Sequence, residues 1–252
     1  MNRFARVTLL VGLSCFSFSC KSKDAPPVAH RATKPFTPPD AATASTISGT
    51  ITFSGGIPSP QKIEMSQDPA CGSTINLDPS LIVNNGDLAN VFVYVKEGLE
   101  DFSFTPPARP VTIAQKDCRY EPHIAAAMVD QTVEFDNEDD TTHNVHMMPR
   151  EIRQWNESQM PGAAPIEKKF DRPEIMIPVK CNQHPWMRMN LSVVPHPFFA
   201  VTGKDGKFSI AGLPPGTYTI AAVHERLGEH DTKVTVSPRE SKIVDFHFKS
   251  TP

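Results

Sequence analysis

Residues 181–187 read Cys-Asn-Gln-His-Pro-Trp-Met, and residues 142–146, further upstream, read Thr-His-Asn-Val-His. In the first segment a cysteine, a histidine and a methionine are spaced C-x2-H-x2-M, so one short loop can close around a single metal ion. A histidine of the second segment completes the shell. Thiolate and thioether are soft donors that suit Cu(I), whereas imidazoles suit Cu(II), so this donor set is typical of a mononuclear site that passes one electron. The predicted metal ligands are His143, Cys181, His184 and Met187.

The cysteine count supports a metal at the loop. Five cysteines are present, at positions 15, 20, 71, 118 and 181, and the first two lie in an N-terminal export segment. If Cys71 pairs with Cys118, as oxidising surroundings favour, Cys181 is the cysteine left over. An unpaired thiol outside the cytoplasm is a liability unless something occupies it. This reasoning favours a metal over a disulfide at Cys181.

The loop reads C-x-x-H-P-[aromatic]-M-R and the upstream segment reads H-N-V-H, and here the chain resembles the cupredoxins, amicyanin most closely. Residues 130–135 (Asp-Gln-Thr-Val-Glu-Phe) stand where that family has G-D-T-V-x-[FW]; Asp-Gln replaces the usual Gly-Asp. The resemblance implies a cupredoxin Greek-key sandwich that holds one type 1 copper. The thiolate of Cys181 then gives the blue colour.

The resemblance also implies roles around the metal. His143 is expected to come from the other sheet and to be buried, and Asn144 to brace the cysteine loop. His184 is expected to face outward as the exit route of the electron, with Pro185 and Trp186 in an apolar docking patch.

The axial ligand has two candidates. Met187 fits the C-x2-H-x2-M spacing, and Met189 fits the longer C-x2-H-x4-M spacing seen in plastocyanin. Aligning the strand that follows without a gap favours Met187, with Met189 as a packing residue.

The N-terminus predicts export. Residues 1–19 carry two arginines and then an apolar run of signal-peptide length, too short for a permanent transmembrane helix. Ser-Phe-Ser-Cys20 followed by Lys resembles a bacterial lipoprotein cleavage site, which predicts a lipid on Cys20; plain secretion is the alternative. Residues 20–46 are rich in proline and predict an extended tether. We expect the protein in the periplasm or on the outer surface, with membrane contact only through this lipid.

Beyond the tether, short β-rich runs separated by turn residues predict an all-β protein. Residues 106–196 form the predicted cupredoxin domain. Residues 47–105 and 197–252 resemble the transthyretin-like, carboxypeptidase-regulatory-like β-sandwich, and Asp205-Gly206 is read as a hairpin signal. The simplest organisation is one such sandwich with the cupredoxin domain inserted; two tandem domains are the alternative.

The sequence favours an electron carrier over an enzyme. A net charge of −3 does not indicate a nucleic-acid partner. A binuclear copper centre needs two cysteines in the loop, and a trinuclear one needs His-x-His pairs, and the sequence has neither. The expected partner is a redox protein such as a c-type cytochrome or a dehydrogenase. The alternatives are a carbohydrate- or protein-binding sandwich with structural or sensory copper, and a copper carrier. The acidic run at residues 134–140 is read as a solvated loop.

Overall fold

The computed structural model describes residue 40, residues 42–72 and residues 75–250, all within one compact unit that spans residues 34–252. The predicted signal peptide, Cys20 and most of the predicted tether lie outside the described residues. The first strand begins at Ser45, one residue before the predicted end of the tether.

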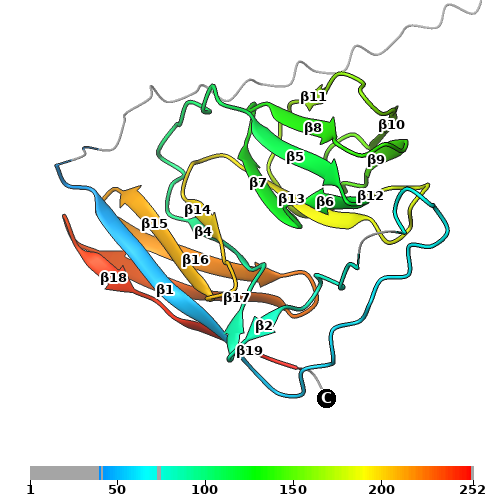
Figure 1. Ribbon diagram of the computed structural model, residues 1–252. Coiled ribbons are helices and arrows are strands. Elements are labelled where there is room, and N and C mark those ends of the chain that lie inside the picture. The colour runs from blue at the N-terminus through cyan, green and yellow to red at the C-terminus, as the bar shows by residue number, and fades with distance from the viewer. Residues whose placement is uncertain (1–39, 41, 73–74, 251–252) are drawn as a thin grey trace, which may run out of the picture. The chain divides into compact units, whose positions relative to one another are not determined.

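Two stretches that are far apart in the sequence build one pair of sheets (Figure 1). One sheet has the order β15-β1-β3-β2, with β18 and β19 pairing in parallel with β1, and the other has the order β14-β4-β16-β17. The strands are β1 (Ser45–Ser54), β2 (Val83–Asn84), β3 (Asp87–Leu88), β4 (Phe92–Glu97), β14 (Phe199–Val201), β15 (Lys207–Leu213), β16 (Gly216–His224), β17 (Gly228–Val236), β18 (Ser241–Ile243) and β19 (Phe246–Lys249).

Alternating side chains of these strands bury one core. Ile47, Ile51 and Phe53 are separated by even numbers of residues on β1, so they point to the same face, and all are buried. They pack with buried residues of the facing sheet such as Val93 and Ile220. The strands before residue 98 and those after residue 198 therefore share a hydrophobic core.

The prediction of a hairpin at Asp205-Gly206 is wrong. The strands on either side of it, β14 and β15, belong to different sheets, since β14 pairs with β4 and β15 pairs with β1. Gly206 is still required by the turn: its φ is +64°, and a Cβ there would lie 2.6 Å from the carbonyl oxygen of Ile51. The Asp-Gly pair thus turns the chain from one sheet to the other.

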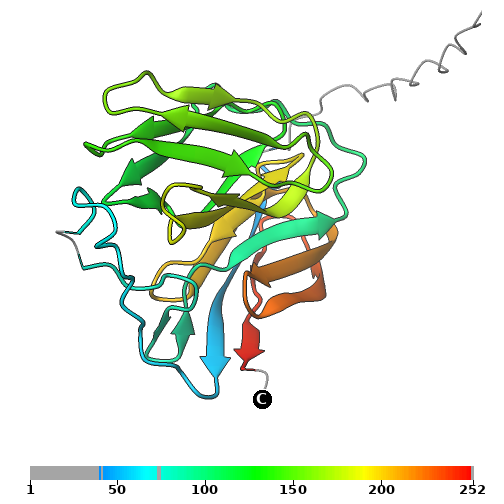
Figure 2. The same cartoon turned by 90° about the vertical axis from the view of Figure 1, so that its right-hand side faces the viewer.

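The strands between residues 111 and 194 pair only with one another among the described strands (Figure 2). A five-stranded sheet has the order β10-β9-β12-β13-β7, and a four-stranded sheet has the order β11-β8-β5-β6. The strands are β5 (Val111–Lys116), β6 (Arg119–Glu121), β7 (Ile124–Met128), β8 (Val133–Asn137), β9 (His143–Met147), β10 (Trp155–Gln159), β11 (Ile166–Lys168), β12 (Glu174–Lys180) and β13 (Arg188–Val194).

These two sheets enclose a second core that includes Ile113, Phe135, Val145 and Leu191. A small third cluster joins the two halves, with Phe92 and Tyr94 of β4 against Ile124 and Val194. The predicted domain boundaries at 105/106 and 196/197 stay a prediction.

None of the residues that the structure describes is helical, which confirms the all-β prediction. Accordingly, the described part of the chain has no helix long and apolar enough to cross a membrane.

Candidate metal centre

His143 and Cys181 come from neighbouring strands of the five-stranded sheet. Cys181 directly follows β12, and His143 is the first residue of β9. The prediction that His143 comes from the other sheet is wrong: β9 and β12 pair antiparallel, with Lys180 opposite His146. The start of β9 therefore extends past the end of β12, where the loop begins. His143 is fully buried, as expected.

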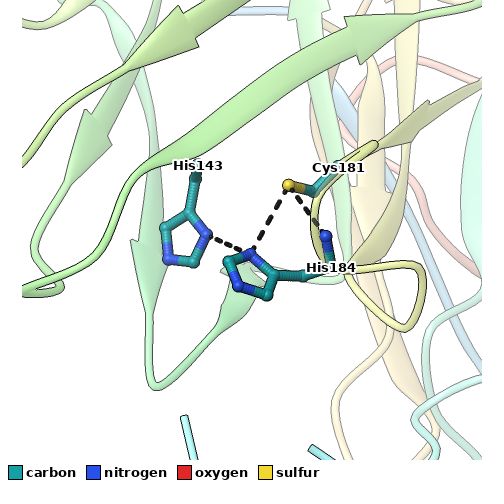
Figure 3. A group of neighbouring side chains, drawn as sticks. All are labelled: His143, Cys181 and His184. Carbon is teal, nitrogen blue, oxygen red and sulfur yellow. Dashed lines mark hydrogen bonds between the residues drawn. The ribbon is translucent and has the colours of Figure 1, made fainter. Parts of the chain in front are cut away.

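The donor atoms of three predicted ligands converge, and Figure 3 shows the His143 ring directed at the His184 ring, with the sulfur atom of Cys181 next to His184. Nδ1 of His143 lies 2.8 Å from Nδ1 of His184, and Sγ of Cys181 lies 3.7 Å from the same His184 atom. The described residues include one free cysteine, Cys181, whose thiol is buried. A buried thiol and two buried imidazoles thus share one small volume.

Two backbone hydrogen bonds close the loop. The N–H of Cys181 donates to the carbonyl oxygen of Met187 at 3.1 Å, and the N–H of Met187 donates to that of His184 at 2.9 Å. Met187 and Met189 are both buried in the same core as Cys181. The choice between these methionines as axial ligand stays open.

Asn144 connects the two ligand-bearing segments. Its N–H points to Sγ of Cys181 at 3.5 Å, and its Oδ1 accepts a hydrogen bond from the N–H of Asn182 at 2.7 Å. The side chain predicted to brace the cysteine loop lies in contact with it.

The prediction that His184 faces outward is wrong, because only 4% of the residue is exposed. Nε2 of His184 donates to Oδ2 of Asp68 at 2.9 Å, and Asp68 belongs to the segment between β1 and β2. That segment covers the histidine. Next to His184 in the loop, Pro185 is exposed and Trp186 is half-buried. The ring centroid of Trp186 lies 5.1 Å from that of His184, and its Nε1–H donates to the carbonyl oxygen of Cys118.

His143 has a matching carboxylate. Its Nε2 donates to Oδ2 of Asp139 at 2.9 Å, and the backbone N–H groups of Asp117 and Cys118 also donate to Asp139, each at 2.8 Å. This corrects the reading of the acidic run as a merely solvated loop. The sequence did contain a signal, since Asp139 stands four residues before His143.

Asp68 was also missed, although it stands three residues before Cys71. Cys71 and Cys118 form a disulfide, which brings the segment of Asp68 to the turn that holds Asp139. The disulfide therefore holds the segment of Asp68 beside the centre, a contact for which the sequence has no local signal.

The carboxylates of Asp68 and Asp139 determine which imidazole nitrogens are available to bind a metal. Hydrogen bonding to His184 lowers the pKa of Asp68. Burial raises the pKa of Asp139, but the hydrogen bonds that Asp139 accepts, first the one from His143, outweigh burial and lower this pKa overall. An ionised carboxylate only accepts hydrogen bonds, so Nε2 carries a proton in each ring. The Nδ1 atoms therefore face the centre, 2.8 Å apart, where both can bind one cation.

The thiol is poised to ionise. Burial opposes ionisation of Cys181, but hydrogen bonds from His143 and from the backbone N–H groups of Asn144, Gln183 and His184 lower its pKa to about 6. Burial lowers the pKa of His143, yet its hydrogen bonds to Asp139 and Cys181 raise it overall.

These donors fit a metal ion. With bonds of about 2.0 Å to nitrogen and about 2.3 Å to thiolate, tetrahedral donors lie roughly 3.3 to 3.6 Å apart. The separations of 2.8 Å between the nitrogens and 3.7 Å between nitrogen and sulfur bracket that range. Both histidines also donate Nε2–H to a carboxylate, an arrangement usual for metal-bound imidazole.

No protein-family model matches this sequence. No curated protein matches it either. Solved structures similar to this chain include a Cu-containing nitrite reductase from Thermus scotoductus SA-01, with 18% identity over 47% of this chain and a TM-score of 0.32. A purple cupredoxin from Nitrosopumilus maritimus has 19% identity over 33% of this chain and a TM-score of 0.29. A Cu(I) form of an amicyanin variant has 17% identity over 40% of this chain and a TM-score of 0.30.

The alignments span 27% of the nitrite reductase chain, 98% of the purple cupredoxin and 97% of the amicyanin variant. These identities and TM-scores are too low to assign a function, which has to follow from the residues of the site.

Proposed function

We propose that this chain is a type 1 copper protein that carries single electrons and is not an enzyme with a substrate of its own. The observation that carries the proposal is the convergence of the Cys181 thiol with Nδ1 of His143 and Nδ1 of His184 in a buried site. Two imidazoles and one thiolate with a weak thioether ligand form the donor set of blue-copper centres. Copper bound there would supply a reversible one-electron couple.

The surrounding protein supports that role by holding the donors still. Cys181 follows a strand, His143 begins the neighbouring strand, and Asn144 binds both segments. Donors fixed by backbone and hydrogen bonds change little between oxidation states. Burial of both histidines keeps water from the site.

The electron's route to a partner follows from the surface beside His184. That histidine is covered, but Trp186 contacts its ring and is half-buried, and Pro185 next to it is exposed. We infer that Pro185 and Trp186 form the docking patch for a redox protein such as a c-type cytochrome or a dehydrogenase.

The proposed location is the periplasm or the outer surface, with a lipid on Cys20 as the anchor. The Cys71–Cys118 disulfide supports a compartment outside the cytoplasm, because such bonds persist in oxidising surroundings.

Electron self-exchange between Cu(I) and Cu(II) protein, measured by NMR line broadening, tests the transfer function. We expect fast exchange that Pro185→Glu and Trp186→Glu each slow about tenfold or more, because two negative patches then repel in the encounter complex. Ile243→Glu is the matched control, since Ile243 is 74% exposed on β18. Slow exchange in the wild type, unchanged by the patch variants, would favour structural or sensory copper instead.

A further inference from the structure

His184 is covered by a segment that lies between β1 and β2 in the chain, which we call the cover segment, Met65 to Gly72. Its Met65 and Cys71 side chains are buried in the core that also contains Cys181. Between them, Asp68 directs Oδ2 at Nε2 of His184, with a separation of 2.9 Å. The two side chains are 24% and 5% exposed, respectively. The contact is therefore sheltered from solvent.

Asp68 is held in that position by other groups. Its Oδ1 accepts a hydrogen bond from the N–H of Ala70 at 2.9 Å, and its Oδ2 accepts a second one from the hydroxyl of Thr141 at 2.9 Å. The backbone carbonyl of Asp68 accepts from the N–H of Cys71 and of Gly72. These hydrogen bonds fix the orientation of the carboxylate.

The cover segment is also cross-linked to the hairpin that supports the other histidine. The Cys71–Cys118 disulfide joins it to the β5–β6 turn, where the N–H of Cys118 donates to Asp139, the carboxylate that binds His143. A single covalent bond therefore connects the supports of the two imidazoles.

A carboxylate at Nε2 has two effects on a histidine ligand. It fixes the tautomer and the ring orientation, so that the lone pair of Nδ1 points to the metal, and it makes the imidazole a stronger donor. Its negative charge also favours the more highly charged Cu(II) over Cu(I).

We propose that Asp68 is a positioning residue that fixes His184 from a segment distant in the sequence, with the disulfide-anchored cover segment holding its carboxylate in place. The inference rests on the proposed function only in taking the metal to be copper. Asp68 contacts the ligand and not the metal.

The first test uses metal-free protein, so it does not depend on copper. In the wild type, imidazole nitrogen NMR is expected to show His184 in a single tautomer with Nε2 protonated. Asp68→Ala is expected to give a mixture of tautomers. Asp78→Asn is the matched control, because Asp78 is an exposed carboxylate of the same connecting segment whose Oδ1 accepts from the N–H of Ser80. An unchanged His184 tautomer in Asp68→Ala would overturn the proposal.

The second test measures Zn²⁺ affinity and the copper reduction potential of Asp68→Asn. We expect about 10- to 100-fold weaker Zn²⁺ binding, the usual cost of losing such a partner. The potential should rise, by about 59 mV for each tenfold by which Cu(II) affinity falls more than Cu(I) affinity. A variant that only loosens the loop would lose stability without raising the potential.

The outcomes separate the two proposals. If the wild type lacks a copper–thiolate band while Asp68→Asn still weakens Zn²⁺ binding and Asp68→Ala alters the tautomer, the copper function fails and the positioning role stands. If the wild type has the band and the Asp68 variants match Asp78→Asn in tautomer, affinity and potential, the positioning role fails alone.

Discussion

Oδ1 of Asn144 accepts a hydrogen bond from the backbone N–H of Asn182 at 2.7 Å, and this bond connects the strand of His143 to the loop of Cys181. Asn144 is buried, so its removal leaves the N–H of Asn182 without this partner. We expect Asn144→Ala to destabilise the metal-free protein by about 0.5–1.5 kcal/mol, the usual net contribution of one hydrogen bond.

Denaturant unfolding measures this change. Asn156→Ala serves as the control, since Asn156 bonds the Asn144 amide from an exposed position and does not contact the loop. If both variants lower the free energy of unfolding by the same small amount, the hydrogen bond to Asn182 does not brace the loop.

The Cys71–Cys118 disulfide should be present in the mature protein while Cys181 stays reduced. Replacing both disulfide cysteines by serine is expected to cost about 2–4 kcal/mol of stability, because a long loop of the unfolded chain is no longer constrained. Mass mapping of non-reduced peptides identifies the pairing. A peptide in which Cys181 is disulfide-bonded to another cysteine would contradict the account, because Cys181 would then have no thiolate to bind a metal.

The two methionines can be separated by their effect on the potential. If Met187 is the weak axial ligand, Met187→Leu keeps the colour and raises the reduction potential, because losing this donor destabilises Cu(II) more than Cu(I). Met189→Leu should leave the potential near that of the wild type, since leucine nearly conserves the packed volume. A shift with Met189→Leu alone would assign the longer spacing.

The stability of the metal-free protein should depend on pH through Cys181. The pKa of its thiol is lowered from 9.0 in the unfolded reference to about 6 in the folded protein. A thiol whose pKa is lower in the folded protein than in the unfolded chain stabilises the fold fully at a pH above its unfolded pKa. That stabilisation is lost as the pH falls through its folded pKa. The contribution of Cys181 is therefore complete above pH 9.0, declines below it and is gone below about pH 6.

Unfolding free energies of the metal-free wild type and of Cys181→Ser, measured between these pH values, test the dependence. The difference between the two proteins should grow as the pH rises. The raised pKa of His143 acts in the opposite direction, because its contribution is lost as the pH rises through the folded value. A difference that stays flat or falls with rising pH would show that the folded thiol is not ionised in this range.

The closeness of Cys181 and His184 could be predicted from the sequence because their spacing is local. Cys181 and His184 share one short loop, and the all-β class follows from alternation within single strands. The burial of His184 depends instead on packing between segments that are distant in the chain, and no local pattern shows that Asp68 lies against it. The pairing of β15 with β1 was missed for a similar reason, since an Asp-Gly turn does not say which strand comes next.

The absorption spectrum of purified protein loaded with one equivalent of Cu(II) tests the central claim most directly. The account predicts an intense visible band from thiolate-to-copper charge transfer, and Cys181→Ser should abolish it while leaving the fold intact. A colourless wild type that holds stoichiometric copper, or one that binds Zn²⁺ in place of copper, would contradict the type 1 assignment.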